Sequence, residues 1–240
     1  MQLRVATYNV HKCKGLDGRT DPRRVAEVVR SLDADVVGLQ EVLDVREGLG
    51  KYDQARTMAD QMNGYEWRFG ENRRMRGGSY GNMLLSRFPI ASFTNYDLSH
   101  RKRERRGCLR ADVTPEAGQE VHLFNVHLGT GFMERRHQGR AFLSLLETAE
   151  VSGPRIVLGD FNEWTRGLAS QGLSEAFETF EPGAALGRSR TYPGLLPVLH
   201  LDHFYYDPQL RLESIRLVRT PAALIASDHL PLIAEFVLDS

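Results

Sequence analysis

The sequence predicts a mixed α/β protein, and three observations support this class. Short apolar runs bounded by turn-forming residues recur from one end of the 240 residues to the other, as strands do in globular folds. Several of these runs are almost continuously apolar, which is typical of strands buried on both faces. Helical patterns lie between the runs, so strands and helices alternate along the chain and do not occupy separate halves.

The apolar runs that we predict as strands are short, and each ends in polar or turn-forming residues. Their order along the chain sets which intervals are free for helices. They are Leu3–Val10, Asp35–Leu39, Asn82–Leu85, Gly107–Val113, Val121–His127, Arg155–Leu158, His200–Tyr206 and Leu232–Leu238.

Three of the intervals show helical patterns. The first begins at Asp21-Pro22, where the aspartate is a favourable N-cap and the proline suits the first turn, and it continues through Val25 and Val29. The second spans Gln54 to Met62, and the third spans Glu134 to Ala149. These patterns complete the alternation of strands and helices.

The chain is predicted to be a single domain over residues 1–240. No linker rich in proline, glycine and serine divides it, and no short-period repeat is present. The segment Glu181–Pro197 is the most loop-like stretch, but it lies within the series of strands. We therefore predict a long surface loop there and not a domain boundary.

Composition excludes several classes of protein. The 31 Lys and Arg residues balance 31 Asp and Glu residues, so only a local patch of charge can attract a polyanion. The two cysteines, Cys13 and Cys108, are too few for a disulfide framework or a thiolate zinc site. The chain has no signal-peptide pattern and no apolar stretch of transmembrane length, so we expect a cytoplasmic protein without a transmembrane segment.

Polar residues capable of chemistry follow the predicted strands, at the point where each strand ends or shortly before the next one begins. Strand ends are where sites assemble in layered α/β folds. The groups are Asn9-Val10-His11, Gln40-Glu41, Asn125-Val126-His127, Gly159-Asp160-Phe161-Asn162, Leu201-Asp202-His203 and Ser227-Asp228-His229.

Each group taken alone has an ordinary structural explanation. Asn9 or Glu41 is typical of a turn or loop, Asp160 and Asn162 are typical of a helix cap, and His127 is typical of a partly buried, hydrogen-bonded histidine. Six independent strand ends are unlikely to carry such residues by chance. We therefore interpret the groups as one site.

The residue types indicate metal-assisted chemistry on phosphorus. Carboxylates and amides without cysteine suit a hard cation such as Mg²⁺ or Mn²⁺. A histidine beside an aspartate is typical of an imidazole held in one tautomer for proton transfer. The sequence has neither a Gly-x-Ser-x-Gly motif nor a phosphate-binding loop ending in Gly-Lys-Ser/Thr, which argues against serine hydrolases and nucleotide-driven motors.

An ordered set of motifs resembles the endonuclease/exonuclease/phosphatase family, which includes deoxyribonuclease I, exonuclease III, neutral sphingomyelinases and inositol polyphosphate 5-phosphatases. The chain looks most like the small bacterial members. The resemblance implies a four-layer α/β sandwich, with two mixed β-sheets packed face to face and helices on the outside. The motifs are Thr7-Tyr8-Asn9-Val10-His11, Leu39-Gln40-Glu41-Val42, Tyr80-Gly81-Asn82-Met83-Leu84-Leu85-Ser86-Arg87, Asn125-Val126-His127-Leu128, Gly159-Asp160-Phe161-Asn162 and Ser227-Asp228-His229-Leu230-Pro231.

The resemblance also implies a metal site. Glu41 is then the principal ligand, and Asn9 and Asp228 lie close to the ion. Mg²⁺ is the expected cofactor, with Mn²⁺ as a substitute. Whether one or two ions bind stays open.

Five further residues receive catalytic roles from the resemblance. Asp160 positions or activates the attacking water, and Asn162 binds a phosphate oxygen in the transition state. His229 acts on the scissile phosphate as a base or a charged stabiliser, and Asp202 holds its ring. His127 is expected to protonate the leaving group, and the identity of the general base stays open.

Two basic runs are candidates for contact with the substrate. They are 73–76, which precedes the motif containing Tyr80 and Asn82, and 101–106, which precedes the strand carrying Arg110. Most charge runs are solvated surface, but both of these lie near site motifs. The residues expected to contact substrate are Tyr80, Asn82, Arg103, Arg105 and Arg110.

The function predicted from these features is a divalent-metal-dependent phosphoesterase. A phosphodiesterase acting on nucleic acid or a phospholipid headgroup is the leading hypothesis, and a phosphomonoesterase acting on a phosphorylated sugar or lipid headgroup is the alternative. A non-catalytic nucleic-acid-binding module is the hypothesis from a different class. We expect a monomer with no obligate protein partner.

Overall fold

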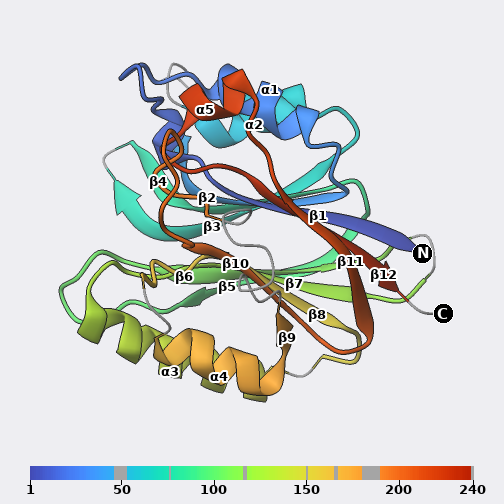
Figure 1. Cartoon of the computed structure of the whole chain (residues 1–240). Helices are drawn as coiled ribbons and strands as arrows, with labels where there is room; N and C mark the ends of the chain where they lie inside the picture. The colour runs from blue at the N-terminus through green and yellow to red at the C-terminus, as the bar shows by residue number, and fades with distance from the viewer. Residues whose placement is uncertain are drawn as a thin grey trace.

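Two six-stranded sheets form the centre of the molecule (Figure 1). The computed structural model describes residues 1–45, 53–75, 77–115, 118–149, 151–164, 167–179 and 190–238. The first sheet has the order β11 (Leu210–Leu217), β12 (Leu232–Leu238), β1 (Gln2–Asn9), β2 (Val36–Val45), β4 (Gly78–Ser86) and β3 (Glu66–Met75). The second has the order β5 (Ile90–Asp97), β6 (Gly107–Val113), β7 (Val121–His127), β8 (Arg155–Asp160), β10 (Asp202–Tyr206) and β9 (Glu178–Thr179).

Helices cover the outer face of each sheet. Figure 1 shows α1 (Pro22–Ser31), α2 (Gln54–Gln61) and α5 (Pro221–Ala226) over the first sheet, and α3 (Phe132–Thr148) and α4 (Leu168–Ala176) over the second. Both sheets combine parallel and antiparallel pairs. The four-layer sandwich with two mixed sheets is therefore confirmed. Within the described residues, no helix has the length and apolar character needed to cross a membrane.

Three apolar cores separate the four layers, and strand β1 shows why. Its side chains alternate in direction, as the two-residue period of a strand requires. Leu3 and Val5 belong to the core between the two sheets, whereas Ala6 and Tyr8 belong to the core under α1 and α2. The third core lies between the second sheet and helices α3 and α4. A strand with apolar residues on both faces is stable only between two such layers.

The predicted helix starts agree with the structure to within two residues. The side chain of Asp21 accepts hydrogen bonds from the backbone nitrogens of Arg23 and Arg24 at 3.0 and 3.2 Å, and Pro22 occupies the first turn of α1. Helix α3 begins at Phe132, two residues before the predicted start.

Several elements were not predicted from the sequence. They are β3, β5, β9, β11, α4 and α5, and β2 and β4 are longer than predicted. Strands β3, β5, β9 and β11 lie at the ends of the sheets. An edge strand exposes many polar side chains, so its sequence lacks the continuous apolar run that marks a central strand. Of the predicted loop Glu181–Pro197, residues 181–189 lie outside the described residues.

The topology brings the polar strand ends to one edge. Strands β1 and β2 are parallel neighbours, and so are β7 and β8, so their carboxyl ends lie side by side within each sheet. Strand β10 runs antiparallel to β8, which places Asp202 opposite Asp160. Strand β12 runs antiparallel to β1, which brings the loop before Leu232 to the same edge.

Candidate active site

Strained backbone segments shape the edge of the first sheet. His11, Lys12 and Cys13 follow β1 with φ values of 45°, 55° and 55°, in the left-handed region that non-glycine residues rarely occupy. Glu41 has φ of 61°, at an irregularity in the pairing of β2 with β4. Such bulges redirect a side chain and occur often beside active sites. Asn162, after β8, is also in this conformation, with φ of 51°.

Asp160 is the centre of the buried polar cluster. Asn9 donates from Nδ2 to its Oδ2 at 2.9 Å, and the backbone nitrogen of Asn162 donates to its Oδ1 at 2.9 Å. The Nε2 atoms of His127 and His229 lie 3.6 and 3.7 Å from Oδ2. Burial raises the pKa of Asp160, and the charge of Asp202 adds to this effect. One carboxylate thus joins both sheets and both histidines.

His229 lies between two carboxylates. Its Nδ1 is 2.9 Å from Oδ2 of Asp202, and both side chains are buried. Burial opposes the charged imidazolium, but the charges of Asp202 and Asp160 outweigh it and raise the pKa of His229. The aromatic ring of Tyr192 lies against this imidazole, with 5.0 Å between the ring centroids. The position and charge of this ring are therefore set by its neighbours.

The pKa of His127 is shifted in the opposite direction to that of His229. Burial lowers its pKa well below the ordinary value, and the positive charge of Arg106 adds to this effect. Its Nε2 is 3.3 Å from Nδ2 of Asn162, and Asn162 also donates to the carbonyl of Leu128 at 3.0 Å. The two histidines of the cluster are thus placed in opposite protonation states at neutral pH.

Glu41 is held as an anion beside positive charges. Burial works to raise its pKa, but the attraction to His127 in its protonated form, the charge of Lys12 and the hydrogen bond from Lys12 outweigh it and lower the pKa to about 2. The Nζ atom of Lys12 lies 2.9 Å from Oε2 of Glu41 and 5.5 Å from the ring centre of Tyr80. Tyr80 in turn accepts a hydrogen bond at its hydroxyl from Arg106 at 3.2 Å.

Lys12 and Arg106 were not predicted as site residues from the sequence. Lys12 directly follows the first motif, and Arg106 ends the second basic run. Arg106 is 5% exposed, unlike Arg105 in the same run, which is exposed and pairs with Asp97. The hydrogen bond of Arg106 to Tyr80, which is distant in the sequence, distinguishes these two neighbours, and composition carries no signal of it.

The loop before β12 is anchored to β1. The hydroxyl of Ser227 donates to the backbone oxygen of Asn9 at 2.8 Å. The next residue, Asp228, lies with Oδ1 3.4 Å from Nδ1 of His11. Asp228 and Asn9 therefore belong to one local cluster, as expected of residues proposed to share an ion.

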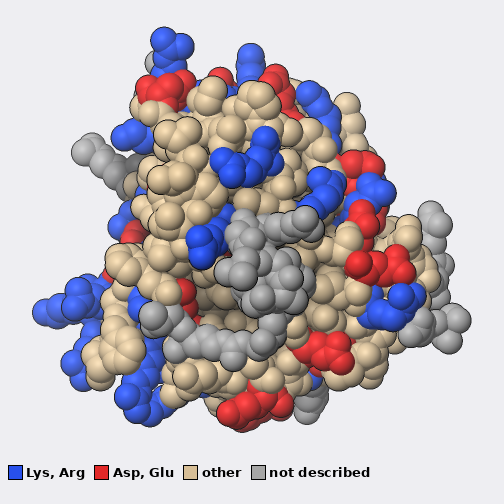
Figure 2. All heavy atoms as spheres, viewed as in Figure 1, with Lys and Arg blue, Asp and Glu red and all other residues tan. Residues whose placement is uncertain are grey.

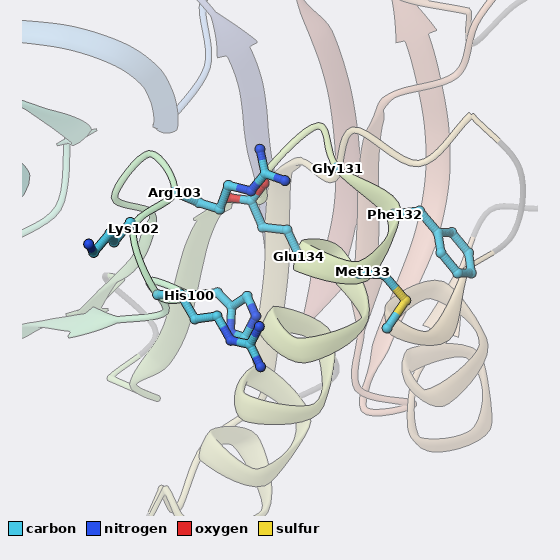
Figure 3. A pocket seen from close by; sticks show the side chains of 8 residues that line it. His100, Lys102, Arg103, Gly131, Phe132, Met133 and Glu134 are labelled. Atoms are coloured by element: carbon cyan, nitrogen blue, oxygen red, sulfur yellow. The ribbon is translucent and has the colours of Figure 1, made fainter.

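Other residues that the sequence predicted for the site are not part of the buried cluster around Asp160. Arg110 makes two hydrogen bonds to Asp112, at 2.8 and 2.9 Å, away from the strand ends. Asn82 is buried between the sheets, where its Nδ2 donates to the carbonyls of Gly107 and Asn125 at 3.1 Å each. Their positions suit structural roles. Arg103 lies on the wall of a pocket beside the edge (Figure 3).

Known proteins resemble this chain in sequence and in fold. The model of the Endonuclease/Exonuclease/phosphatase family matches residues 6–229. The chain belongs to this family. It is 32% identical over 252 residues to "Uncharacterized protein YbhP" of Escherichia coli (strain K12), an alignment that covers 98% of this chain and 96% of that protein. Members of the Endonuclease/Exonuclease/phosphatase family are generally hydrolases of phosphoester bonds.

Solved structures share the fold. A family protein from Bacteroides vulgatus superposes with a TM-score of 0.81 at 18% identity, and each chain covers all of the other. D. rerio TDP2 complexed with single strand DNA product has a TM-score of 0.77 at 18% identity, over 98% of this chain and 99% of that one. The mannosyl-6-phosphatase Bt3783 of Bacteroides thetaiotaomicron VPI-5482 has a TM-score of 0.77 at 19% identity, with the same coverage.

Family membership implies a divalent metal, and the donor set at the edge suits one. Glu41, Asp228 and the amide of Asn9 offer oxygen ligands, which Mg²⁺ and Mn²⁺ prefer. The ammonium of Lys12 lies beside the Glu41 carboxylate, so this carboxylate faces a positive charge.

A second group of potential metal ligands lies at the other end of β6 and β7. The ligand atoms of Asp112, Glu120 and His122 lie within 4.8 Å of one another. Asp112 is already bonded to Arg110 and to Nδ1 of His122, and Nε2 of His122 accepts from the backbone of Gly153. We interpret this group as a hydrogen-bonded structural network.

Proposed function

We propose that this chain is a divalent-metal-dependent phosphodiesterase that hydrolyses its substrate by attack of water. The observation that carries the proposal is the position of His229, with Asp202 on Nδ1 and Asp160 facing Nε2. This arrangement orients an imidazole toward one reacting point, which is the requirement for proton transfer or charge stabilisation in a transition state.

The groups around Asp160 have the other roles in the proposed hydrolysis. Asp160 accepts hydrogen bonds from Asn9 and Asn162 and keeps one oxygen facing both histidines, which suits it to hold a water molecule. The side-chain amide of Asn162 is a donor for a phosphate oxygen on which charge develops. His127, which its burial holds in the neutral form, suits a hydrogen bond to a phosphate or leaving-group oxygen, and it would have to take up a proton before it could protonate the departing oxygen.

Glu41, Asn9 and Asp228 are the residues that we propose hold the ion, Mg²⁺ or Mn²⁺. A bound divalent ion neutralises phosphate charge and polarises the phosphorus centre. The low pKa of Glu41 keeps this ligand ionised throughout the neutral range.

A phosphomonoesterase is the second candidate. The cations that surround Tyr80, namely Lys12, Arg73 and Arg106, favour it, because the phosphate of a monoester carries two negative charges. The named relatives of the same fold include both a protein complexed with single strand DNA product and a mannosyl-6-phosphatase. A cytoplasmic location, a monomeric state and a single domain over 1–240 stay predictions.

Hydrolysis of a substrate panel by the purified chain tests the proposal. The panel contains plasmid DNA, single-stranded RNA, a bis-aryl phosphate, phospholipids, inositol phosphates and sugar phosphates, each with Mg²⁺, Mn²⁺ or chelator. We expect metal-dependent cleavage of a diester. Release of inorganic phosphate from monoesters alone would favour the second candidate, and inactivity of the folded protein on the whole panel would contradict both.

A further inference from the structure

Exposed hydrophobic side chains gather around the active-site edge. Among the large hydrophobic residues that the described part of the chain exposes, most come from loops and helix ends that connect the strands. Large apolar side chains exposed close together mark interaction surfaces. We name this set the apolar rim, and it consists of Leu16, Phe132, Met133, Trp164, Leu195, Leu196, Val198 and Ile225.

The segment that carries Leu195 and Leu196 lies directly beside the proposed catalytic residues. The backbone nitrogen of Gly194 donates to the carbonyl of Asp228 at 2.7 Å. Leu195 and Leu196 are 68% and 73% exposed, so the protein itself buries little of either side chain. A bridge between Tyr192 and Leu199 closes the segment into a hairpin.

The rim continues on two other segments of the chain. The backbone nitrogen of Leu16 donates to the carbonyl of Ile225 at 3.0 Å, so these two exposed residues are neighbours. Ile225 lies two residues before Ser227, whose hydroxyl contacts Asn9. On the second sheet, Phe132 and Met133 begin helix α3 and are 66% and 68% exposed.

Positive charge accompanies the rim. A pocket of about 840 Å³ has Lys102 and Arg103 on one side and Phe132 and Met133 on the other (Figure 3), and Arg101 also lines it. Figure 2 shows Lys and Arg gathered over the part of the surface where Figure 1 places the start of α3. Because the chain as a whole carries no net charge, this positive surface is a local feature.

We propose that the apolar rim and the 101–103 loop dock the protein on an anionic phospholipid bilayer, with the active-site edge toward the lipid. Aliphatic side chains insert among acyl chains while nearby Lys and Arg contact acidic headgroups. The docking proposal rests on the exposed side chains of the rim and of the 101–103 loop. A second claim, that the bilayer also supplies the substrate, rests on the proposed function.

The composition of the rim favours lipid over the other partners. Single-stranded nucleic acid is bound by aromatic stacking. Only Phe132 and Trp164 of the rim are aromatic, and the aliphatic majority has no flat face for a base. A second copy of the chain would bring the same positive loop to the contact, and like charges oppose such pairing.

Co-sedimentation of the full chain with vesicles tests the proposal. The vesicles contain phosphatidylcholine alone or phosphatidylcholine with phosphatidylglycerol. The variants are Leu195→Ser/Leu196→Ser, which removes apolar contact, and Arg101→Gln/Lys102→Gln, which removes charge. Phe93→Ser is the matched control, because Phe93 is 49% exposed but lies on β5, outside the rim.

We expect the native chain to sediment with anionic vesicles and much less with neutral ones. The loss of each cation should weaken binding about fivefold. The leucine variant should lose most of its binding, and Phe93→Ser should bind as the native chain does. Equal binding of all four proteins, or no binding by the native chain, would overturn the proposal.

Two further measurements separate this proposal from its alternatives. Tight, rim-dependent binding of a single-stranded oligonucleotide with no binding to vesicles would overturn it in favour of nucleic acid. His229→Ala should bind anionic vesicles as the native chain does, because this residue lies in the buried cluster. Vesicle binding without phospholipid hydrolysis would uphold docking while contradicting a phospholipid substrate.

Discussion

The Nδ1 atom of His229 lies 2.9 Å from Oδ2 of Asp202, and both side chains are buried. The antiparallel register of β10 and β8 places Asp202 opposite Asp160, so the same imidazole faces a carboxylate at each nitrogen. The contact therefore fixes the ring and its charge together. It also connects a loop near the end of the chain with the second sheet.

Replacement of His229 by alanine tests the central role of this ring. Because a positioned acid–base group contributes roughly 10²–10⁴-fold, His229→Ala should lower turnover at least about a hundredfold with the fold intact. Steady-state kinetics on the substrate found in the panel, with circular dichroism as a check of folding, measures this. His137→Ala is the control, because His137 is exposed on α3 and should leave turnover unchanged. Near-native turnover of His229→Ala would remove this residue from the mechanism.

Replacement of Asp202 by asparagine tests how the charge of His229 is set. The Asp202 carboxylate favours the imidazolium, so its removal should lower the pKa of His229. The limb of the pH profile of kcat/KM that reports His229 should then move to lower pH by about one unit or more. Asp112→Asn, at the other end of the sheet, should leave the profile in place. A limb that does not move in Asp202→Asn would show that another group titrates.

The proposed metal ligand Glu41 has a direct binding test. Glu41→Gln keeps the size of the side chain but removes the negative charge, so Mn²⁺ should bind at least about tenfold more weakly. Isothermal titration calorimetry measures this without any turnover. Glu120→Gln, in the second acidic group, serves as the control. Unchanged Mn²⁺ affinity in Glu41→Gln would exclude Glu41 as a ligand.

Asp112 gives a pH-dependent prediction about stability. Burial works to raise its pKa, but hydrogen bonds from His122, Arg110 and Ser92 lower it to about 2. A carboxyl whose pKa is lower in the folded than in the unfolded chain stabilises the fold at pH values above its unfolded pKa. This contribution is lost as the pH falls toward 2.

Asp112→Asn should therefore lower the free energy of unfolding at pH 7 by at most about 2 kcal/mol, after allowance for solvent screening. Urea denaturation of both proteins at pH 7 and near pH 2.5 measures the difference. The difference should shrink at the lower pH. An equal difference in the free energy of unfolding at both pH values would show that the ionised carboxylate of Asp112 does not cause it.

Gly38 tests the packing between the sheets. A Cβ atom there would overlap Cδ1 of Leu158 and lie 3.0 Å from the side-chain carbon Cγ of Asn125. Gly38→Ala should therefore destabilise the fold by about 1–3 kcal/mol, the usual cost of overpacking. Gly194→Ala is the matched control, since the nearest atom to its Cβ lies at 3.4 Å. Equal stability of the two variants would show that the sheets separate without cost.

Local patterns in the sequence were enough to predict the central strands and the first helices. Strand β12 was predicted with the observed bounds, because its apolar run, interrupted only by Glu235, belongs to a strand covered on both sides. Asp21 was predicted as an N-cap from the local sequence alone, since capping depends only on residues a few positions away. The edge strands were missed because their exposed side chains break the apolar pattern.

Tertiary structure decided which polar residues meet. Asp160, Asp202 and His229 are far apart in the sequence, and the register of β8 and β10 and the position of the loop before β12 bring them together. Arg106 and Arg110 are equally basic and only four residues apart, yet one is buried beside Tyr80 and the other pairs with Asp112. The sequence by itself determined the residue types and their order, whereas contacts between distant strands determined the charge and position of each side chain. Local propensity acts over a few residues, but the electrostatic environment of a buried group comes from every layer packed around it.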